Sequence, residues 1–191
     1  MSIFKILRLF ILGLIYSFTL SSTAFAQSTI LVVDQGRVIR DSLVGKHVQA
    51  QMKSIATSME AEIKASTSPI ETERDRLVNE LKNMDANALK SRPDLQKRAQ
   101  DIMQKGQKTQ VEAAYKQREL QITEAKAMKQ VNERLAKILE TIVAERKADV
   151  ILDRSLVIYG GKSTDITDTV VARLNLQMRT VPVIRERLPR K

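Results

Sequence analysis

The chain has 191 residues with 32 basic and 22 acidic side chains, a formal net charge of +10, one His and no Cys. This charge density excludes a protein that spans a membrane several times, and the lack of Cys excludes thiolate nucleophiles and thiolate metal sites. The length is sufficient for one or two modest domains.

Residues 1–26 have the three parts of a secretory signal peptide. Lys5 and Arg8 precede an apolar run over residues 9–20, and Ala24-Phe25-Ala26 matches an A-x-A cleavage site. We expect cleavage after Ala26. The alternative is an uncleaved anchor, but the run of about 12 residues is shorter than the roughly 20 that a spanning helix needs.

Removing this segment leaves a net charge of +8 and only two aromatic residues, both Tyr. Aromatic side chains bury the largest areas in ordinary cores. The mature composition therefore indicates an elongated protein, and the lack of Cys in an exported chain indicates stability from helix packing or self-association.

Residues 29–34 form a short apolar run that predicts a buried strand, followed by the turn-prone pair Gln35-Gly36. Asp41 or Ser42 can cap the helix that begins next. We assign residues 27–42, together with residues 149–176, to a small β-rich association body.

Residues 43–148 have a composition that favours helix, and we predict a helical hairpin arm there. Apolar positions in its first half recur every 11 residues, which favours nearly straight or slightly right-handed pairing. Pro69 interrupts this stripe, and we expect the helix to bend or loosen there. Turn-forming residues predict that the chain reverses near residues 86–92, with Pro93 opening the second helix.

The second helix should reach about Lys147, a length of roughly 80 Å. Its residues 128–143 are densely apolar, whereas residues 104–127 offer few large apolar side chains. This distribution predicts firm packing at the base of the arm and thin packing along its length.

Residues 149–153 and 156–160 predict two further strands, and Asp165 can cap a short helix that follows. Residues 177–191 hold five basic and one acidic residue with two prolines, which predicts a flexible basic tail. Because a small sheet is marginally stable alone, we expect association through the strands. The candidate oligomerisation residues are Ile30, Leu31, Val32, Val33, Val150, Ile151, Leu152, Val157, Ile158 and Tyr159.

The sequence offers no specific catalytic pattern. His47 has no second His or carboxylate pair nearby, so we interpret it as a solvated helical residue. Asp34 and Asp153 each follow a predicted strand, where paired acids can act in catalysis, but Asp is commonplace before turns. The glycines match neither a phosphate loop nor a dinucleotide fingerprint. We therefore expect no enzyme activity, no cofactor and no metal.

The predicted tip is basic, with seven basic and three acidic residues between positions 82 and 108. One interpretation is attraction to acidic chains or anionic lipid head groups, and the other is a merely solvated tip. A nucleic-acid binder would also be basic. However, the export signal and the shortage of stacking aromatics argue against nucleic acid as a partner.

Several motifs follow one another in a recognisable order. The run of residues 32–38 is followed by Ser42 and Gly45-Lys46, then the long charged hairpin, then residues 150–153 and Asp165-Ile166-Thr167. This order, over about residues 30–175, resembles the Skp/OmpH-like periplasmic chaperones. The basic tail after Leu176 extends past the family's usual closing helix, and no individual contact residue in the arms can be carried over.

The resemblance implies an α+β fold in which a long antiparallel helical hairpin projects from a small β body that assembles into a barrel-like core. It implies a periplasmic homotrimer whose arms surround a cavity for unfolded outer-membrane proteins. We therefore expect an ATP-independent holdase; the alternative is an exported coiled-coil spacer or envelope adaptor. The candidate client-binding residues at the tip are Lys82, Met84, Leu89, Lys90, Arg92, Leu95, Lys97, Arg98, Lys105 and Lys108.

Overall fold

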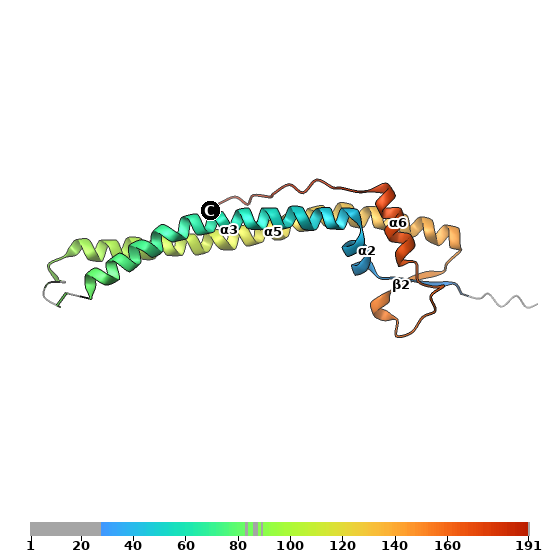
Figure 1. Ribbon diagram of the computed structural model, residues 1–191, viewed down its shortest axis with the longest axis horizontal. Helices are drawn as coiled ribbons and strands as arrows, with labels where there is room; N and C mark the ends of the chain where they lie inside the picture. The colour runs from blue at the N-terminus through green and yellow to red at the C-terminus, as the bar shows by residue number, and fades with distance from the viewer. Residues whose placement is uncertain (1–27, 83, 86–87, 89, 191) are drawn as a thin grey trace, which may run out of the picture.

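The computed structural model describes residues 28–82, 84–85, 88 and 90–190, so the predicted signal peptide lies outside the described residues. A long antiparallel helical hairpin projects from a small base that contains both strands and helices (Figure 1). The elements are β1 (Ile30–Val33), α2 (Gln35–Asp41), α3 (Leu43–Leu81), α5 (Pro93–Arg146), β2 (Val150–Asp153), the 3-10 helix η1 (Arg154–Leu156) and α6 (Thr167–Gln177). The predicted combination of a helical hairpin and a small β region is confirmed.

The base is organised around β1 and β2, which pair in parallel with Ile30 opposite Val150 and Val33 opposite Asp153. The other edge of β1 meets residues 164–166: the Val32 amide donates to the Thr164 carbonyl at 2.8 Å, and the Ile166 amide donates to the Val32 carbonyl at 2.9 Å. The small sheet thus joins residues 30–33 with segments that follow the arm in sequence, residues 150–153 and 164–166.

The predicted strand over residues 156–160 is wrong. After β2 the Asp153 side chain accepts a hydrogen bond from the Ser155 amide at 2.9 Å, and η1 follows. This local hydrogen bond favours a turn over a further extended segment. Residues 157–160 consequently form no strand.

Two helix starts follow from short side chains that cap the backbone. Asp34 accepts from the Arg37 amide at 2.7 Å, so the Gln35-Gly36 pair opens α2, where the sequence predicted a turn. Ser42 accepts from the Gly45 amide at 3.1 Å and caps α3, as one of the two predicted alternatives.

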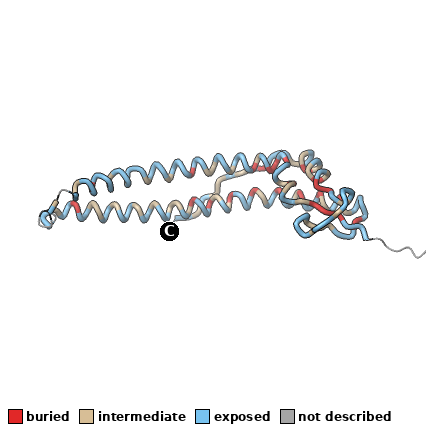
Figure 2. The backbone as a smooth tube through the Cα atoms, turned by 60° about the horizontal axis from the view of Figure 1, so that its bottom comes forward, coloured by how far each residue is buried: buried red, intermediate tan, exposed pale blue. Residues whose placement is uncertain are grey.

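The arm consists of α3 and α5, two uninterrupted helices that run side by side (Figures 1 and 2). The expected loosening at Pro69 does not interrupt α3, which has 39 residues and contains this proline in its interior. The chain reverses between Leu81 and Pro93, and Pro93 occupies the first turn of α5 as predicted. Positions 83, 86–87 and 89 of the reversal lie outside the described residues.

The hydrophobic core is concentrated in the base, as the red segments of Figure 2 show. Val131, Leu135, Ile138 and Ile142 of α5 bury the face that meets the base. Further out, the described arm buries only isolated large apolar side chains, namely Met59, Leu77 and Leu95. The packing is therefore firm at the base and thin along the arm.

The C-terminal residues differ from the predicted flexible tail. After α6, residues 178–190 contain no helix or strand, but they turn back and lie along the arm (Figure 1). Val181 is buried in the core cluster, and further along Arg185 and Arg190 make ion pairs with the arm. We call residues 178–190 the C-terminal strap.

Among the described residues, no helix combines the length and the apolarity that crossing a membrane requires.

Candidate functional site

The surface of the hairpin has two long faces between α3 and α5. One face carries the C-terminal strap between the base and Glu112. The other face, which we call the open groove, has a hollow of about 580 Å³ lined by Val48, Met52, Leu120 and Met128. A second hollow of about 270 Å³ continues it towards the tip, and both hollows include Leu120.

The open groove is shallow and mainly apolar, with charged side chains such as Arg40, Lys53 and Glu124 among its lining residues. Met52 and Met128 are half-buried. Methionine side chains are flexible and polarisable, so they adapt to apolar partners of different shapes. The groove is therefore suited to weak, adaptable contacts with apolar side chains.

The strap is held to the arm through the carboxylate of Glu119, which is 0% exposed. Its Oε1 atom accepts from the Leu188 amide at 2.9 Å and from Arg190 Nη1 at 2.5 Å. One turn further along α5, Thr123 Oγ1 accepts from the Glu186 amide at 2.9 Å. Two alternate backbone amides of the strap thus donate to side chains of one helix.

Further ion pairs and ring contacts anchor the strap along its length. Arg185 Nη1 lies 2.6 Å from Glu62 Oε1, and Arg190 Nη2 lies 2.7 Å from Glu112 Oε1. The Arg190 guanidinium also stacks 4.7 Å from the centre of the Tyr115 ring. Nearer the base, His47 Nε2 lies 3.1 Å from the Val181 carbonyl oxygen, so this His is a strap contact and not simply a solvated residue.

These contacts stabilise the charged form of the carboxylates. Hydrogen bonds from Arg185 and Lys116 lower the pKa of Glu62 to about 2. Burial favours the neutral form of Glu119, but hydrogen bonds from Arg190 and the Leu188 amide outweigh it and lower the pKa of Glu119. The hydrogen bond from Arg190 also lowers the pKa of Glu112. The arm therefore presents charged carboxylates to the strap at neutral pH.

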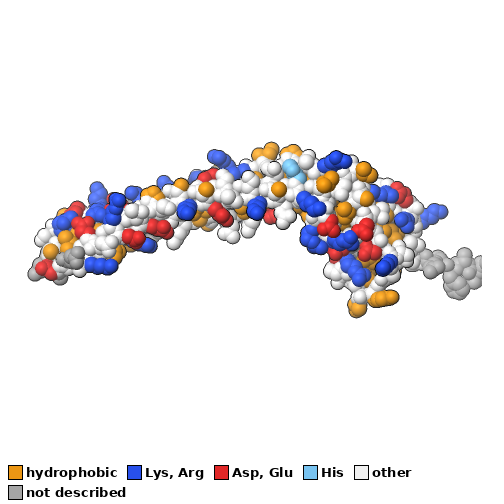
Figure 3. All heavy atoms as spheres, in the orientation of Figure 1, with side chains coloured by type: hydrophobic (Ala, Val, Ile, Leu, Met, Phe, Trp, Pro, Cys, Tyr) orange, Lys and Arg blue, Asp and Glu red, His pale blue; other side chains and the backbone are white. Residues whose placement is uncertain are grey.

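The predicted basic tip is partly neutralised by acidic residues of α3 and by Asp94 of α5. Arg98 pairs with Glu73 and Glu80 at 2.7 Å each, and Arg92 pairs with Glu80 at 3.0 Å and with Asp94 at 2.8 Å. Both arginines thereby link the two helices. Figure 3 shows the resulting mixture of basic and acidic side chains near the tip.

The remaining tip candidates divide by exposure. Leu95 is only 2% exposed, so its side chain packs inside the arm, and Met84 is half-buried. Leu89 lies outside the described residues. Among the described residues, the lysines predicted at the tip make no ion pair: Lys82, Lys90, Lys97, Lys105 and Lys108.

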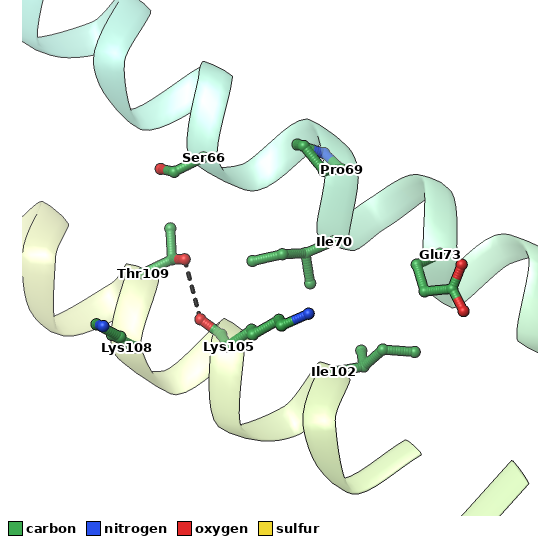
Figure 4. A pocket seen from close by; sticks show the side chains of 8 residues that line it. All are labelled: Ser66, Pro69, Ile70, Glu73, Ile102, Lys105, Lys108 and Thr109. Carbon is green, nitrogen blue, oxygen red and sulfur yellow. Dashed lines mark hydrogen bonds between the residues drawn. The ribbon is translucent and has the colours of Figure 1, made fainter. Parts of the chain in front are cut away.

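A cavity of about 310 Å³ lies between the helices where Pro69 interrupts the apolar stripe. In Figure 4, Ile70 of α3 points towards Ile102 and Lys105 of α5 across this gap. The two helices are thus loosely packed here, although α3 itself continues. The cavity lies just beyond the end of the strap, whose Arg190 reaches Glu112.

The candidate oligomerisation residues separate into three groups, of which Ile151, Leu152 and Val157 are half-buried. Leu31, Val32 and Val33 are buried within the chain's own base. By contrast, Ile158 is 103% and Tyr159 90% exposed. We use the name base patch for the large, exposed apolar side chains of the base, which are Ile30, Val150, Leu156, Ile158 and Tyr159. Figure 3 shows hydrophobic side chains exposed at the lower edge of the base.

Sequence reasoning missed Leu156 and every contact of the strap. The strap contacts join positions more than 60 residues apart, such as Glu186 with Thr123 and Leu188 with Glu119. Contacts between such distant positions leave no periodic pattern in the sequence, so they could not be predicted from it. The only available signal was the complementarity between an arginine-rich C-terminus and the glutamates of the arm.

The fold defines a class of protein in which a helical hairpin supplies most of the surface and a small sheet supplies the base. The sequence profile of the outer membrane protein (OmpH-like) family matches residues 29–174. Because this match covers more than half of the chain, the protein belongs to the OmpH-like family. It is similar to the crystal structure of an OmpH-like protein from Caulobacter crescentus CB15.

That similarity has a TM-score of 0.70 with 29% sequence identity, and it covers 85% of this chain and 93% of the other. No protein among those with curated descriptions matches this chain.

Proposed function

We propose that the protein is an ATP-independent holdase of the periplasm, which binds unfolded outer-membrane proteins between helical arms and prevents their aggregation before insertion. The observation that carries this proposal is the open groove along a thinly packed arm in a chain of the OmpH-like family. Barrel strands alternate apolar and polar residues, and in water their unpaired edges favour aggregation. A carrier must therefore cover them at many points.

Many weak contacts within one cavity give retention through effective concentration. The adaptable methionines of the open groove supply contacts of this kind, and the lysines at the tip supply positive charge. Charges in the cavity are screened beyond about 8 Å at physiological salt. The lysines therefore act on contact with acidic segments or anionic lipid head groups, not through a long-range field.

We further propose that the arms are brought together in a homotrimer through the base patch. The patch contains exposed aliphatic and aromatic side chains, and among the described residues no strand pairs with the outer edge of β2. An edge strand with apolar neighbours is a surface on which another strand pairs. Association would cover the patch and place several open grooves around one space.

The proposal predicts that the mature protein suppresses aggregation of a urea-diluted outer-membrane barrel protein when no ATP is present. Light scattering over time measures the effect. Scattering equal to that of a sample without the protein would contradict the proposed function.

The open groove can be tested by a pair of substitutions. We expect the double variant Met52→Ser and Met128→Ser to need about tenfold more protein for half-maximal suppression, because it loses apolar contacts in the groove. Met103→Ser is the matched control, since Met103 is exposed on α5 and does not line the groove. Equal activity of the two variants would show that the groove does not hold the client.

A spacer or envelope adaptor remains the second function compatible with the hairpin. An adaptor would bind one folded partner with a fixed stoichiometry, whereas a holdase binds several unrelated unfolded chains. Native mass measurement with an unfolded barrel client and with its refolded form distinguishes the two functions.

A further inference from the structure

We infer that the arm carries a binding site for an extended polypeptide segment, built from Glu119, Thr123, Glu112 and Glu62, and that the C-terminal strap fills this site as an internal ligand. The site lies on the face opposite the open groove. The part of the inference that concerns client chains rests on the proposed function; the existence of the site does not.

The geometry is that of a site that binds an extended chain. The amides of Glu186 and Leu188 both point at α5, which is the alternation that an extended backbone imposes. They donate to a hydroxyl and a carboxylate spaced one helical turn apart. Because the donors are backbone amides, any residue except proline can make the same two hydrogen bonds at the positions of Glu186 and Leu188.

The site recognises arginine side chains of the segment that it binds. Arg190 reaches both Glu119 and Glu112, and it stacks on Tyr115. Arg185 makes a bidentate pair with Glu62, with Nη–Oε distances of 2.6 and 3.0 Å. Planar guanidinium groups match carboxylates in this two-point geometry better than lysine does. The ligand class is therefore an extended segment that carries arginines about five positions apart.

The site also has acceptor capacity that the strap leaves unused. Glu119 Oε2 is buried and accepts no hydrogen bond, and Arg185 Nη2 lies 3.9 Å from it. A buried carboxylate oxygen without a hydrogen bond is unfavourable. A segment that also donates to Oε2 would therefore bind as well as the strap or better, and an unfolded client of this chemistry displaces it.

The strap competes strongly because it is part of the same chain. A short tether gives an effective concentration on the order of millimolar. A free segment of equal affinity must reach that concentration to displace half of the strap. A client confined between the arms meets this condition, whereas a dilute peptide does not.

The test follows hydrogen exchange of the Glu186 and Leu188 amides in the full chain. We expect both to exchange at least about tenfold more slowly than in a free peptide of residues 178–190, since exchange requires the strap to leave the arm. The same peptide without a label, added at concentrations above roughly 1 mM, should accelerate hydrogen exchange of both amides. A peptide with Ala in place of Arg185 and Arg190 should have no effect.

A matched pair of variants tests the role of the buried carboxylate. Glu119→Gln should accelerate exchange of both amides without added peptide, and Glu133→Gln, on an exposed part of α5, should leave it unchanged. Thr123→Val should accelerate the Glu186 amide most. Equal exchange in the Glu119 and Glu133 variants, or no response to the arginine-containing peptide, would overturn the inference.

Failure of this test and failure of the holdase proposal are distinguishable. The exchange experiment contains no client, and the aggregation assay does not observe the strap. Acceleration by the peptide with no suppression of aggregation would support the site and contradict the holdase function.

Discussion

At the scale of single residues, Gly45 controls how closely α2 approaches α3. A Cβ atom at this position would lie 1.7 Å from the Ile39 carbonyl oxygen, which is backbone and cannot rotate away. The Ser42 cap depends on the same approach, because its side chain accepts from the Gly45 amide. The glycine is thus required for the tight corner between the helices.

We predict that Gly45→Ala lowers the free energy of unfolding by about 1–3 kcal/mol, as other overpacked sites do. Gly106→Ala is the control, because a Cβ atom there meets nothing within 4 Å. Gly106 lies inside α5, so Gly106→Ala should raise the free energy of unfolding by roughly 0.5–1 kcal/mol. Urea unfolding followed by circular dichroism measures both, and an unchanged midpoint for Gly45→Ala would contradict the steric argument.

The sequence predicted some of these local features correctly and others only in part. Pro93 opens α5 as predicted, and Ser42, one of the two predicted caps, caps α3, because capping and first-turn preferences depend only on neighbouring residues. Asp34 caps a helix where a turn was expected, since a following Gln-Gly pair fits both structures. The role of Glu119 was not predictable, because its partners come from the far end of the chain.

At the scale of elements, the strap adds a third chain segment to part of the arm, where it packs beside α3 and α5. Its attachment depends on carboxylates whose pKa values are lowered by arginines: Glu62, at about 2, Glu112 and Glu119. A carboxylate whose pKa is lower in the docked state stabilises docking above its ordinary pKa. That contribution is lost as the pH falls through the ordinary pKa towards the lowered one.

We therefore predict that the strap is fully docked at pH 7 and is progressively released as the pH falls from about 4.5 towards 2. The chemical shift of the Leu188 amide, followed from pH 7 to pH 3, measures docking, while circular dichroism reports whether the helices persist. A shift that stays constant over this range while the helices remain intact would show that the carboxylates do not hold the strap.

The long elements were predictable and the irregular ones were not. The composition of residues 43–148 favours helix throughout, and this agrees with α3 and α5. The segment 156–160 is apolar enough for a strand, yet Asp153 diverts it into a turn. The strap has no periodicity, so its order depends wholly on tertiary contacts.

At the scale of the whole molecule, the base patch leaves large apolar side chains exposed to water. Contiguous exposed apolar surface commonly marks an interaction site. The sequence indicated association from the small size of the sheet, but it assigned to this role three residues of β1 that the chain buries within itself. The structure is needed to distinguish the candidate residues that stay exposed, and can contact another copy, from those that the chain buries within itself.

We predict that the double variant Ile158→Asp and Tyr159→Asp shifts the mature protein to a lower mass, because charges are costly to bury in an apolar contact. Val111→Asp, on an exposed part of the arm, should leave the mass unchanged. Light scattering coupled to size-exclusion chromatography measures both. A wild-type protein that is already monomeric at micromolar concentration would contradict the proposed assembly.

The contacts of residues 178–190 reinforce part of the arm. Between the base and Glu112 these residues brace the two helices, and the loosely packed cavity beside Pro69 lies nearer the tip. A rod that is reinforced over only part of its length flexes just past the reinforcement. We therefore expect the arm to bend more readily beside this cavity than along its braced part, which would let the tip move while the packing of the base stays unchanged.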